Sequence, residues 1–394
     1  MKILYIHTGV ISDRDVADTL QKMGWELEGF SEPSPNVYQD KEYADALLCA
    51  IEEKGINIVF SLRYFPVVSI VCNAVKVKYL SWVCASYEPG VYSCTLLNEC
   101  NYIFLADYAL YQEFSSADFL HVFYLPMGAN VDRIKKVLEK HGNSGECGME
   151  EYETDVTMPQ DIIPRQAMPL HPLSAESPLK DAAKGYLEGC IACQHQLSGL
   201  PSMAEHLPAY VWDELRLHFA PEIGADSIES AAHYYDYQYF NPLITYADRE
   251  IHLNALAQNK YFRDVVLYQD YPCGAKKIRV EKRADYRAEL PLIVRRSRIN
   301  LVVAHRNWKS AIPQISWDIM ASGGFLISNA QPDFFRLFPD CAPVLYTEER
   351  ELLSKAIYYL HHDRERRDLA QELAWEVAHR HTIRQRLEMI FSSI

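Results

Sequence analysis

The chain has 394 residues, of which 49% are hydrophobic, and this is enough apolar material for the cores of two or three domains. Its formal net charge of −14 argues against a general nucleic-acid-binding surface, which needs a basic footprint. The apolar run at the N-terminus is too short for a signal peptide, and no run reaches the roughly 20 apolar residues that cross a bilayer. We therefore expect a cytoplasmic protein without a transmembrane segment.

The cysteines do not suggest a disulfide framework. The ten of them are scattered, and many lie inside apolar runs, which is typical of reduced thiols. One cluster, Cys190-x-x-Cys193-x-His195, has part of the spacing of a zinc site. Such a site needs about four ligands and no second ligand pair is evident, so we predict no bound metal.

The first part of the chain alternates apolar strand-like runs with segments of helical spacing. Ser12 stands where an N-cap is expected, and Gly55 ends a predicted helix. Alternation over short loops favours a parallel sheet, so we predict a Rossmann-like, acceptor-side domain over residues 1–140. The predicted strands span residues 2–7, 25–30, 56–60, 77–83, 102–105 and 121–125, and the predicted helices span residues 13–23, 43–54, 66–75, 91–100 and 108–114.

Two residues of this domain are candidates for a general base. The first strand-to-helix turn holds Gly9 but no G-x-G-x-x-G, which disfavours a tightly held dinucleotide. His7 ends the first strand and Glu88 follows a later one, so they are the imidazole and the carboxylate nearest to the expected cleft. For His7, a strand-end histidine that only makes a hydrogen bond is an equally good interpretation.

The middle of the chain has a different composition. Residues 141–178 are rich in glycine, glutamate and then proline, which predicts a linker or irregular segment. Residues 179–260 have helical spacing and predict an insert in the second domain. Four tyrosines lie within residues 234–239, and such a cluster more often fills a core or a subunit interface than a sugar platform. A homodimer is therefore one possible assembly.

The α/β alternation returns in residues 261–380, and residues 381–394 form a last helix. The most informative run here is 316–331, which reads as a short helix, a turn at Gly323 and Gly324, and a strand. Ligands bind at the carboxyl ends of strands in such sheets, so Asp318, Asn329 and Gln331 are expected to face one crevice. A plain α-turn-β unit with an incidental acid is the alternative. The other predicted elements are strands at 265–268 and 299–304 and helices at 288–297, 352–360, 364–379 and 382–391.

The run Asp318-Ile-Met-Ala-Ser-Gly-Gly-Phe-Leu-Ile-Ser-Asn-Ala-Gln331 resembles the nucleotide-sugar half of CgeB-like (spore-maturation type) glycosyltransferases. These have the GT-B fold, in which two Rossmann-like domains face a cleft. The similarity extends from about Pro242 to the C-terminus, and earlier runs resemble the N-terminal domain that usually precedes this half. The runs that carry it are residues 59–66, 79–83, 92–93, 100–104, 124–130, 356–360, 363–366 and 381–382.

The resemblance implies a metal-independent glycosyltransferase whose co-substrate is a nucleotide-diphosphate sugar and which needs no other cofactor. It assigns Arg306 and Lys309 to the diphosphate, because both follow a strand end and carry the charge that phosphates require. Asp318 takes the place of the acid that binds ribose hydroxyls. It also implies that the last helix crosses back to the first domain. The remaining candidates for donor binding are Ser322, Gly323, Gly324, Asn329 and Gln331.

The sequence departs from the family pattern at four positions that face the expected cleft. Ser310 stands where broader GT-B relatives have a first acid, Ile315 replaces an arginine, and Ala85 replaces an acid of the first domain. Residues 158–161 lack the glycine of the usual loop. Two interpretations remain open: a transferase with a different donor or an unknown acceptor, which we favour, or a catalytically silent homologue that serves as a binding or scaffolding subunit of a partner transferase.

Overall fold

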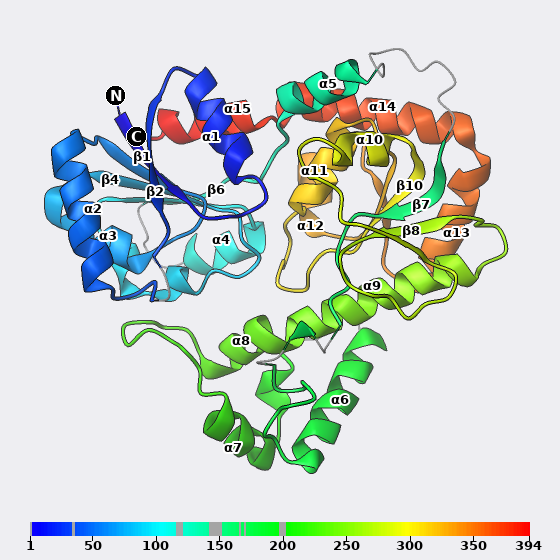
Figure 1. Cartoon of the computed structure of the whole chain (residues 1–394), viewed down its shortest axis with the longest axis horizontal. Helices are drawn as coiled ribbons and strands as arrows, with labels where there is room; N and C mark the ends of the chain where they lie inside the picture. Colours follow the sequence, from blue (N-terminus) through cyan, green and yellow to red (C-terminus); the bar gives the residue numbers. More distant parts are fainter. Residues whose placement is uncertain are drawn as a thin grey trace.

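The computed structural model describes residues 2–33, 36–115, 121–141, 152–164, 167–168, 171–196 and 202–394, without the side chains of residues 195 and 196. In this part of the chain there are two six-stranded parallel sheets, each in its own α/β domain, and a group of helices beneath both (Figure 1). The expected fold class, two Rossmann-like domains, is confirmed.

The first sheet has the strand order β2-β1-β3-β4-β5-β6. Alternate residues of β1 enter different cores, because neighbouring side chains of a strand point to opposite faces. Ile3 and Tyr5 belong to one apolar core and Leu4 and Ile6 to the other, so helices cover both faces. The strands are β1 (Lys2–His7), β2 (Glu26–Ser31), β3 (Ile58–Ser61), β4 (Lys78–Val83), β5 (Asn101–Leu105) and β6 (Val122–Tyr124).

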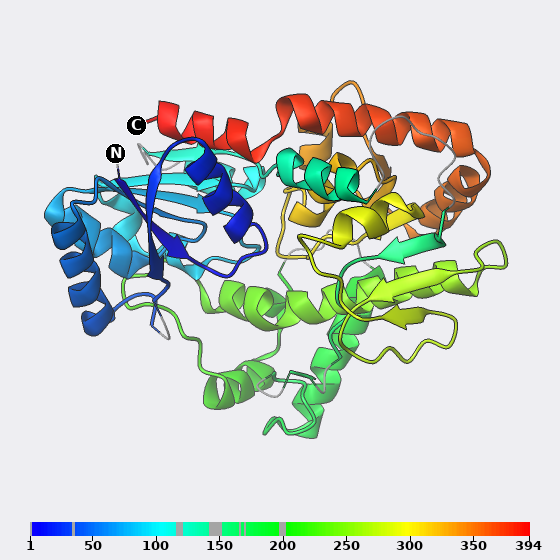
Figure 2. The same ribbon diagram turned by 45° about the horizontal axis from the view of Figure 1, so that its top comes forward.

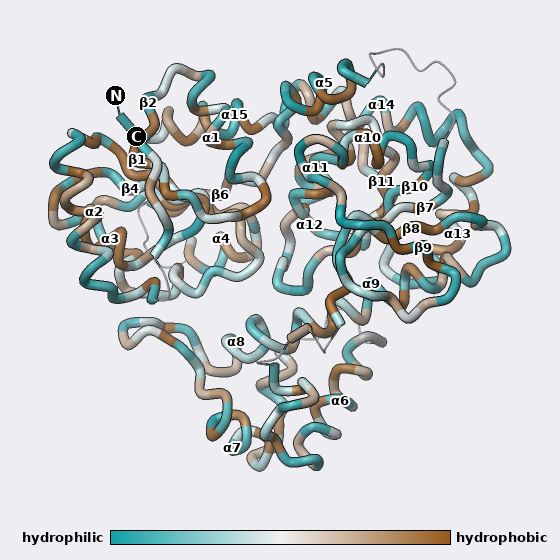
Figure 3. The backbone as a smooth tube through the Cα atoms, viewed as in Figure 1, coloured by the Kyte–Doolittle hydropathy of each residue, from teal (hydrophilic) through white to brown (hydrophobic). Residues whose placement is uncertain are grey.

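The helices of the first domain follow the predicted positions closely. Gly55 ends one of them in the left-handed conformation, with φ 62°, whereas the Ser12 side chain makes no capping hydrogen bond. The segment predicted as a helix over 91–100 forms two short 3₁₀ turns, η1 (Pro89–Tyr92) and η2 (Cys94–Leu97). The α-helices are α1 (Asp13–Lys22), α2 (Lys41–Lys54), α3 (Pro66–Val75), α4 (Tyr108–Ser115) and α5 (Val131–Lys140). Brown and teal residues alternate along α5, as expected for a helix with one buried side (Figure 3).

The second sheet has the order β12-β11-β10-β7-β8-β9. Its strand β7 (Thr154–Met158) lies at the centre, inside residues 141–178, which we predicted to be irregular; that prediction is wrong for β7. Val156 and Met158 are fully buried, and the hydroxyls of Thr154 and Thr157 lie 2.9 and 2.6 Å from the Ser297 hydroxyl. The other strands are β8 (Val265–Tyr268), β9 (Arg279–Glu281), β10 (Ser297–Val302), β11 (Leu326–Asn329) and β12 (Val344–Tyr346).

Helices of the second domain and the insert complete the fold. Tyr234 and Tyr235 are buried in the insert's own core, which agrees with the interpretation of the tyrosine cluster as core. The insert comprises α6 (Asp181–Gln196), η4 (Ala204–His206), α7 (Ala209–His218), α8 (Ala231–Tyr235), a π-helical turn η5 (Asp236–Phe240) and α9 (Asn241–Gln258). The remaining helices are α10 (Leu290–Arg295), α11 (Gln314–Ala321), α12 (Pro332–Leu337), α13 (Glu349–His361), α14 (Asp363–Arg380) and α15 (Ile383–Ser392).

The end of the chain returns to the first domain, where α15 lies against α1 (Figure 2). The Trp25 and Phe391 rings stack with centroids 4.3 Å apart, and Lys78 Nζ donates to the Ile394 carbonyl at 2.8 Å. Where the chain crosses, a Cβ on Gly128 would lie 2.5 Å from the His381 carbonyl oxygen, so only glycine fits there. Among the described helices, none combines the length and the apolar character that a membrane span needs.

Candidate functional site

A cavity of about 790 Å³ lies where the carboxyl ends of β10, β11 and β12 meet the helical insert. Asn329, the last residue of β11, and Gln331 beyond it line the cavity on one side, and Tyr237 and Asn241 line it from the insert. This is the end of a parallel sheet at which ligands generally bind, because loops there converge without filling the crevice. The position of the cavity therefore makes it the candidate ligand site.

Arg306 lines this cavity from the loop after β10. Its Nε donates to Asp248 Oδ2 on α9 at 2.7 Å, and its Nη2 donates to the Gln194 carbonyl on α6 at 3.3 Å. Its backbone N–H donates to Thr245 Oγ1 at 2.9 Å. The insert thus fixes the guanidinium at the cavity wall, and Asp248 balances its charge.

Lys309 lies three residues further along the same loop and also lines the cavity. Its ammonium group forms an ion pair with Glu113 on α4 of the first domain and lies 5.7 Å from the centre of the Tyr237 ring. Its backbone N–H donates to Asp107 Oδ2 at 2.7 Å. The first domain therefore positions the second cation of the cavity.

Two amide side chains, one at the end of β11 and one just after it, line the cavity. Asn329 Oδ1 accepts the Ala304 backbone N–H at 2.7 Å, which links the ends of β10 and β11. Gln331 is 7% exposed, and its Oε1 has no hydrogen-bond partner among the described residues. A buried amide oxygen without a partner costs free energy, so it is a natural contact for a ligand donor.

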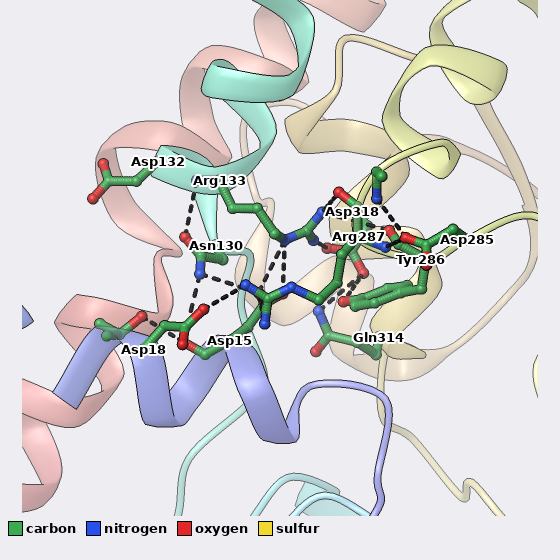
Figure 4. A network of polar contacts seen from close by, with 12 residues as sticks. Asp15, Asp18, Asn130, Asp132, Arg133, Asp285, Tyr286, Arg287, Gln314 and Asp318 are labelled. Carbon is green, nitrogen blue, oxygen red and sulfur yellow. Dashed lines mark hydrogen bonds and ion pairs between the residues drawn. The ribbon is translucent and has the colours of Figure 1, made fainter. Parts of the chain in front are cut away.

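Asp318 does not line this cavity, although we expected it to share a crevice with Asn329 and Gln331. It lies on α11, 1% exposed, in a polar network between the two domains (Figure 4). Tyr286 OH donates to its Oδ2 at 2.7 Å and Gln314 Nε2 at 3.2 Å, and Arg133 Nη2 of α5 lies 3.6 Å from its Oδ1. Burial raises the pKa of Asp318 to about 7, although the Arg133 charge acts in the opposite direction.

The Ser322–Gly323–Gly324 turn is also away from the cavity. Ser322 Oγ donates to the Asp318 carbonyl at 2.7 Å, and Gly323 has φ +73°. A Cβ on Gly324 would lie 2.8 Å from the Val294 carbonyl oxygen of α10. The glycines are thus explained by a helix end packed tightly on a neighbouring helix, not by a backbone that approaches the cavity ligand.

The two candidates for a general base are already engaged. His7 Nδ1 lies 2.8 Å from Asp13 Oδ2, its side chain is 51% exposed, and it does not line the cavity. Glu88 lines a narrow neighbouring cavity of about 20 Å³, where Arg63 donates to both of its oxygens at 2.9 and 3.3 Å. Burial raises the pKa of Glu88, and Arg63 opposes this.

Sequence reasoning missed the pair Glu229 and His233. His233 of α8 lines the cavity, and its Nδ1 lies 2.7 Å from Glu229 Oε1. The available signal was the Glu-x-x-x-His spacing at the start of a helical segment, because residues four apart meet on one side of a helix. That spacing alone does not show that the pair faces a cavity.

Ser310, at the position of the missing acid, contacts an acid from the other domain. Its Oγ donates to Asp107 Oδ1 at 2.8 Å, and Asp107 Oδ2 accepts the backbone N–H of Lys309 and Ser310 at 2.7 and 3.1 Å. Asp107 follows β5 and is 3% exposed. The first domain thus supplies a carboxylate at the place where the broader GT-B pattern has one in the second domain.

The Cys-x-x-Cys-x-His cluster gives no metal site within the part of the chain that the structure describes. Cys190 is half-buried and Cys193 exposed, and no group of three or more His, Cys, Asp or Glu side chains there is arranged to hold a metal ion. The side chain of His195 lies outside the described residues.

Comparisons with known proteins agree with the architecture. Residues 249–392 match the family described as "Glycosyl transferase-like". No curated protein matches the sequence. The N-terminal domain of trehalose-6-phosphate phosphatase from Candida albicans is similar in structure, with a TM-score of 0.53 and 10% identity over 100% of this chain and 96% of that chain. Sucrose-phosphate synthase from Thermosynechococcus elongatus is similar with a TM-score of 0.51 and 10% identity over 100% and 98%.

At this level of identity the solved structures bear on the fold alone. The matched residues hold β8 to β12 of the second sheet but not its strand β7. The chain therefore has a GT-B-type fold of two α/β domains, and its residues 249–392 match the glycosyl transferase-like family.

Proposed function

We propose that the protein is a glycosyltransferase that moves a sugar from a nucleotide-diphosphate donor to a hydroxyl group of an acceptor. The observation that carries this proposal is the cavity at the carboxyl ends of β10 and β11, whose wall on the side of the sheet lies within the matched residues 249–392 and contains Arg306 and Lys309. Two cations at such a strand edge suit a diphosphate, which leaves as the sugar is transferred.

Donor binding requires an exchange of partners in this arrangement. Arg306 is paired with Asp248 and Lys309 with Glu113, so a diphosphate would compete with these carboxylates for both cations. A diphosphate carries more charge than one carboxylate and accepts bidentate hydrogen bonds from a guanidinium, which favours the exchange. The unpaired Gln331 amide and Asn329 lie beside the cations and are proposed to hydrogen-bond the donor.

We further propose that neutralisation of the leaving diphosphate comes from these two side chains and that the reaction needs no metal ion. A metal and a pair of cationic side chains serve the same purpose at a leaving phosphate, which is to stabilise the charge that develops there. We assign Asp318 to the contact between the domains, because Arg133, Tyr286 and Gln314 already surround its carboxylate.

Calorimetric titration with nucleotide diphosphates and their sugars, in the presence of a chelator, tests this proposal. We expect one of UDP, GDP, ADP, CDP or dTDP to bind wild-type protein. Arg306→Gln, which can still hydrogen-bond Asp248, should weaken binding at least tenfold, because a charged hydrogen bond contributes about 1.5–3 kcal/mol.

Arg364→Ala is the matched control, since its side chain is 93% exposed and far along the chain from the cavity. It should bind the nucleotide as tightly as wild-type protein. Wild-type protein that binds none of the nucleotides, or that binds them only with a divalent cation, would contradict the proposal.

A further inference from the structure

We propose that His233, oriented by Glu229, is the general base that accepts the proton of the acceptor hydroxyl. This inference rests on the proposed function and deepens it, because it places the acceptor on the insert wall of the cavity. His233 lines the cavity, and its side chain is 19% exposed. The residue lies before the matched residues 249–392, so the family match does not assign it a role.

The hydrogen bonds of His233 set its tautomer. Nδ1 lies 2.7 Å from Glu229 Oε1, and because an ionised carboxylate can only accept, Nδ1 carries the proton. Nε2 is then the acceptor nitrogen and receives the hydroxyl of Tyr92 at 3.1 Å. A phenolic hydroxyl is thus already bonded to the lone pair that a base needs, and an acceptor hydroxyl that enters the cavity has to displace the Tyr92 hydroxyl from Nε2.

Glu229 is suited to stabilise a histidine that gains a proton. Its side chain is 0% exposed, and Tyr87 OH donates to its Oε1 at 2.7 Å. Its other oxygen, Oε2, has no hydrogen-bond partner among the described residues, and within that set its one ion-pair partner is His233. A buried carboxylate that forms no ion pair with Arg or Lys among the described residues gains most when the facing imidazole becomes positive.

The base and the proposed diphosphate site share one wall of aromatic rings. The His233 and Tyr237 rings stack with centroids 4.0 Å apart, and Lys309 Nζ lies 5.7 Å from the Tyr237 ring centre. All three line the same cavity. A sugar whose phosphate meets Lys309 would therefore lie within reach of a hydroxyl held at His233.

The step balances as a single displacement. The acceptor O–H gives its proton to His233 Nε2 while its oxygen forms a bond to the anomeric carbon of the donor sugar. The bond from that carbon to the phosphate oxygen breaks, and its electron pair leaves on the nucleoside diphosphate, which Arg306 and Lys309 neutralise. The proton passes to solvent after the product leaves. Attack opposite to the leaving group inverts the anomeric configuration.

The alternative is that Glu229 and His233 only stabilise the N-terminus of α8, where Ser230 Oγ accepts the His233 backbone N–H at 3.1 Å. The two roles predict different results for His233→Ala. A base contributes typically 10²–10⁴-fold to the rate and leaves donor affinity unchanged. If the pair has only a structural role, His233→Ala lowers the stability and the donor affinity together with the rate.

The test uses the full chain and the nucleotide sugar that binds wild-type protein, and it follows release of the nucleoside diphosphate with water as the hydroxyl acceptor. We expect His233→Ala to lower kcat at least 100-fold, with a donor Kd within twofold of wild type, and added imidazole to restore part of the rate. The kcat of Glu229→Gln should lie between those of wild type and His233→Ala, because glutamine keeps a hydrogen-bond acceptor for Nδ1 but loses the charge.

The exposed His218 provides the matched control, and His218→Ala should behave as wild type. A His233→Ala variant with wild-type kcat, or one whose loss of rate parallels its loss of donor affinity and melting temperature, would overturn the inference alone. A released sugar of retained anomeric configuration, observed by NMR, would also overturn it. Wild-type protein without donor binding or turnover would overturn the inference and the proposed function together.

Discussion

Arg133 of the first domain and Asp318 of the second face each other across the domain boundary, with Nη2 3.6 Å from Oδ1. The same guanidinium donates through Nε to both oxygens of Asp15 at 2.9 and 3.0 Å. Arg287, also from the second domain, pairs with Asp15 and Asp18 of α1 (Figure 4). Charges from both domains thus alternate in sign through a junction that is buried at Asp15, Arg133 and Asp318, and we infer that it holds the domains in one relative position.

Arg133 is the cation on which this junction depends. Replacing it with methionine leaves Asp15 and Asp318, both 1% exposed, without their shared partner. Removing one partner of a buried ion pair costs about 3–5 kcal/mol, and we expect a loss of this size in the free energy of unfolding, measured in urea.

Lys135→Met on the same helix is the control, because that side chain is 73% exposed and its ion pair contributes little. A loss below about 1 kcal/mol for Arg133→Met would show that the network does not hold the junction.

The raised pKa of Asp318, about 7, makes a prediction about pH. An ordinary aspartate in the unfolded chain titrates near roughly 3.9, so the folded state binds this proton more tightly. The contribution of protonated Asp318 to the free energy of unfolding is therefore complete below about pH 4 and is lost as the pH rises towards 7. Asp318→Asn lacks this dependence. Between about pH 4 and 7, its free energy of unfolding relative to that of wild type should therefore rise by about 1.4 kcal/mol per pH unit.

Urea unfolding at intervals from pH 4 to 8 provides the measurement. Asp132→Asn, whose side chain is 65% exposed, should follow wild type at every pH. A difference between Asp318→Asn and wild type that stays constant across the series would mean that Asp318 remains ionised in the folded protein, beside Arg133.

The sequence was sufficient to predict most elements but not how distant parts meet. The strand at 2–7 and the helix ended by Gly55 depend on local patterns, and both formed as expected. β7 was missed because its two threonines look polar in the sequence, whereas in the fold they bond to Ser297, over 130 residues away.

The candidate site shows the same limit. Arg306 and Lys309 follow a strand end, and their place on the cavity follows from the α/β order. The sequence predicts the helix that carries Asp318, but nearly all of α11 is buried, so its pattern does not say whether Asp318 meets a ligand or Arg133. His233 lines the cavity where the insert contacts Tyr92 of the first domain, and no local pattern in the sequence signals that contact.

Ser310 offers a test of whether Asp107 has taken over the position of the missing acid. In the structure Ser310 Oγ lies 2.8 Å from Asp107 Oδ1, and both residues are buried. An aspartate at position 310 would therefore place a second carboxylate against that of Asp107. We expect Ser310→Asp to lower the unfolding free energy by about 3 kcal/mol or more, and Ser310→Ala by about 1 kcal/mol for one lost hydrogen bond.

The exchange of both residues gives the sharper comparison. Asp107→Ser combined with Ser310→Asp keeps one acid and one hydroxyl at the boundary, so it should recover much of the stability that Ser310→Asp loses. Additive losses in the double variant would contradict the idea that the two positions share one acid.

Hydrogen exchange with the bound nucleotide diphosphate reports where the donor contacts the chain. We expect slower exchange in residues 303–311, which hold Arg306 and Lys309, and in residues 329–333, which begin at the last residue of β11. No such change is expected around the Ser322–Gly323–Gly324 turn. Protection confined to that turn, or to the loop after β1 that follows His7, would contradict a donor site between the second sheet and the insert.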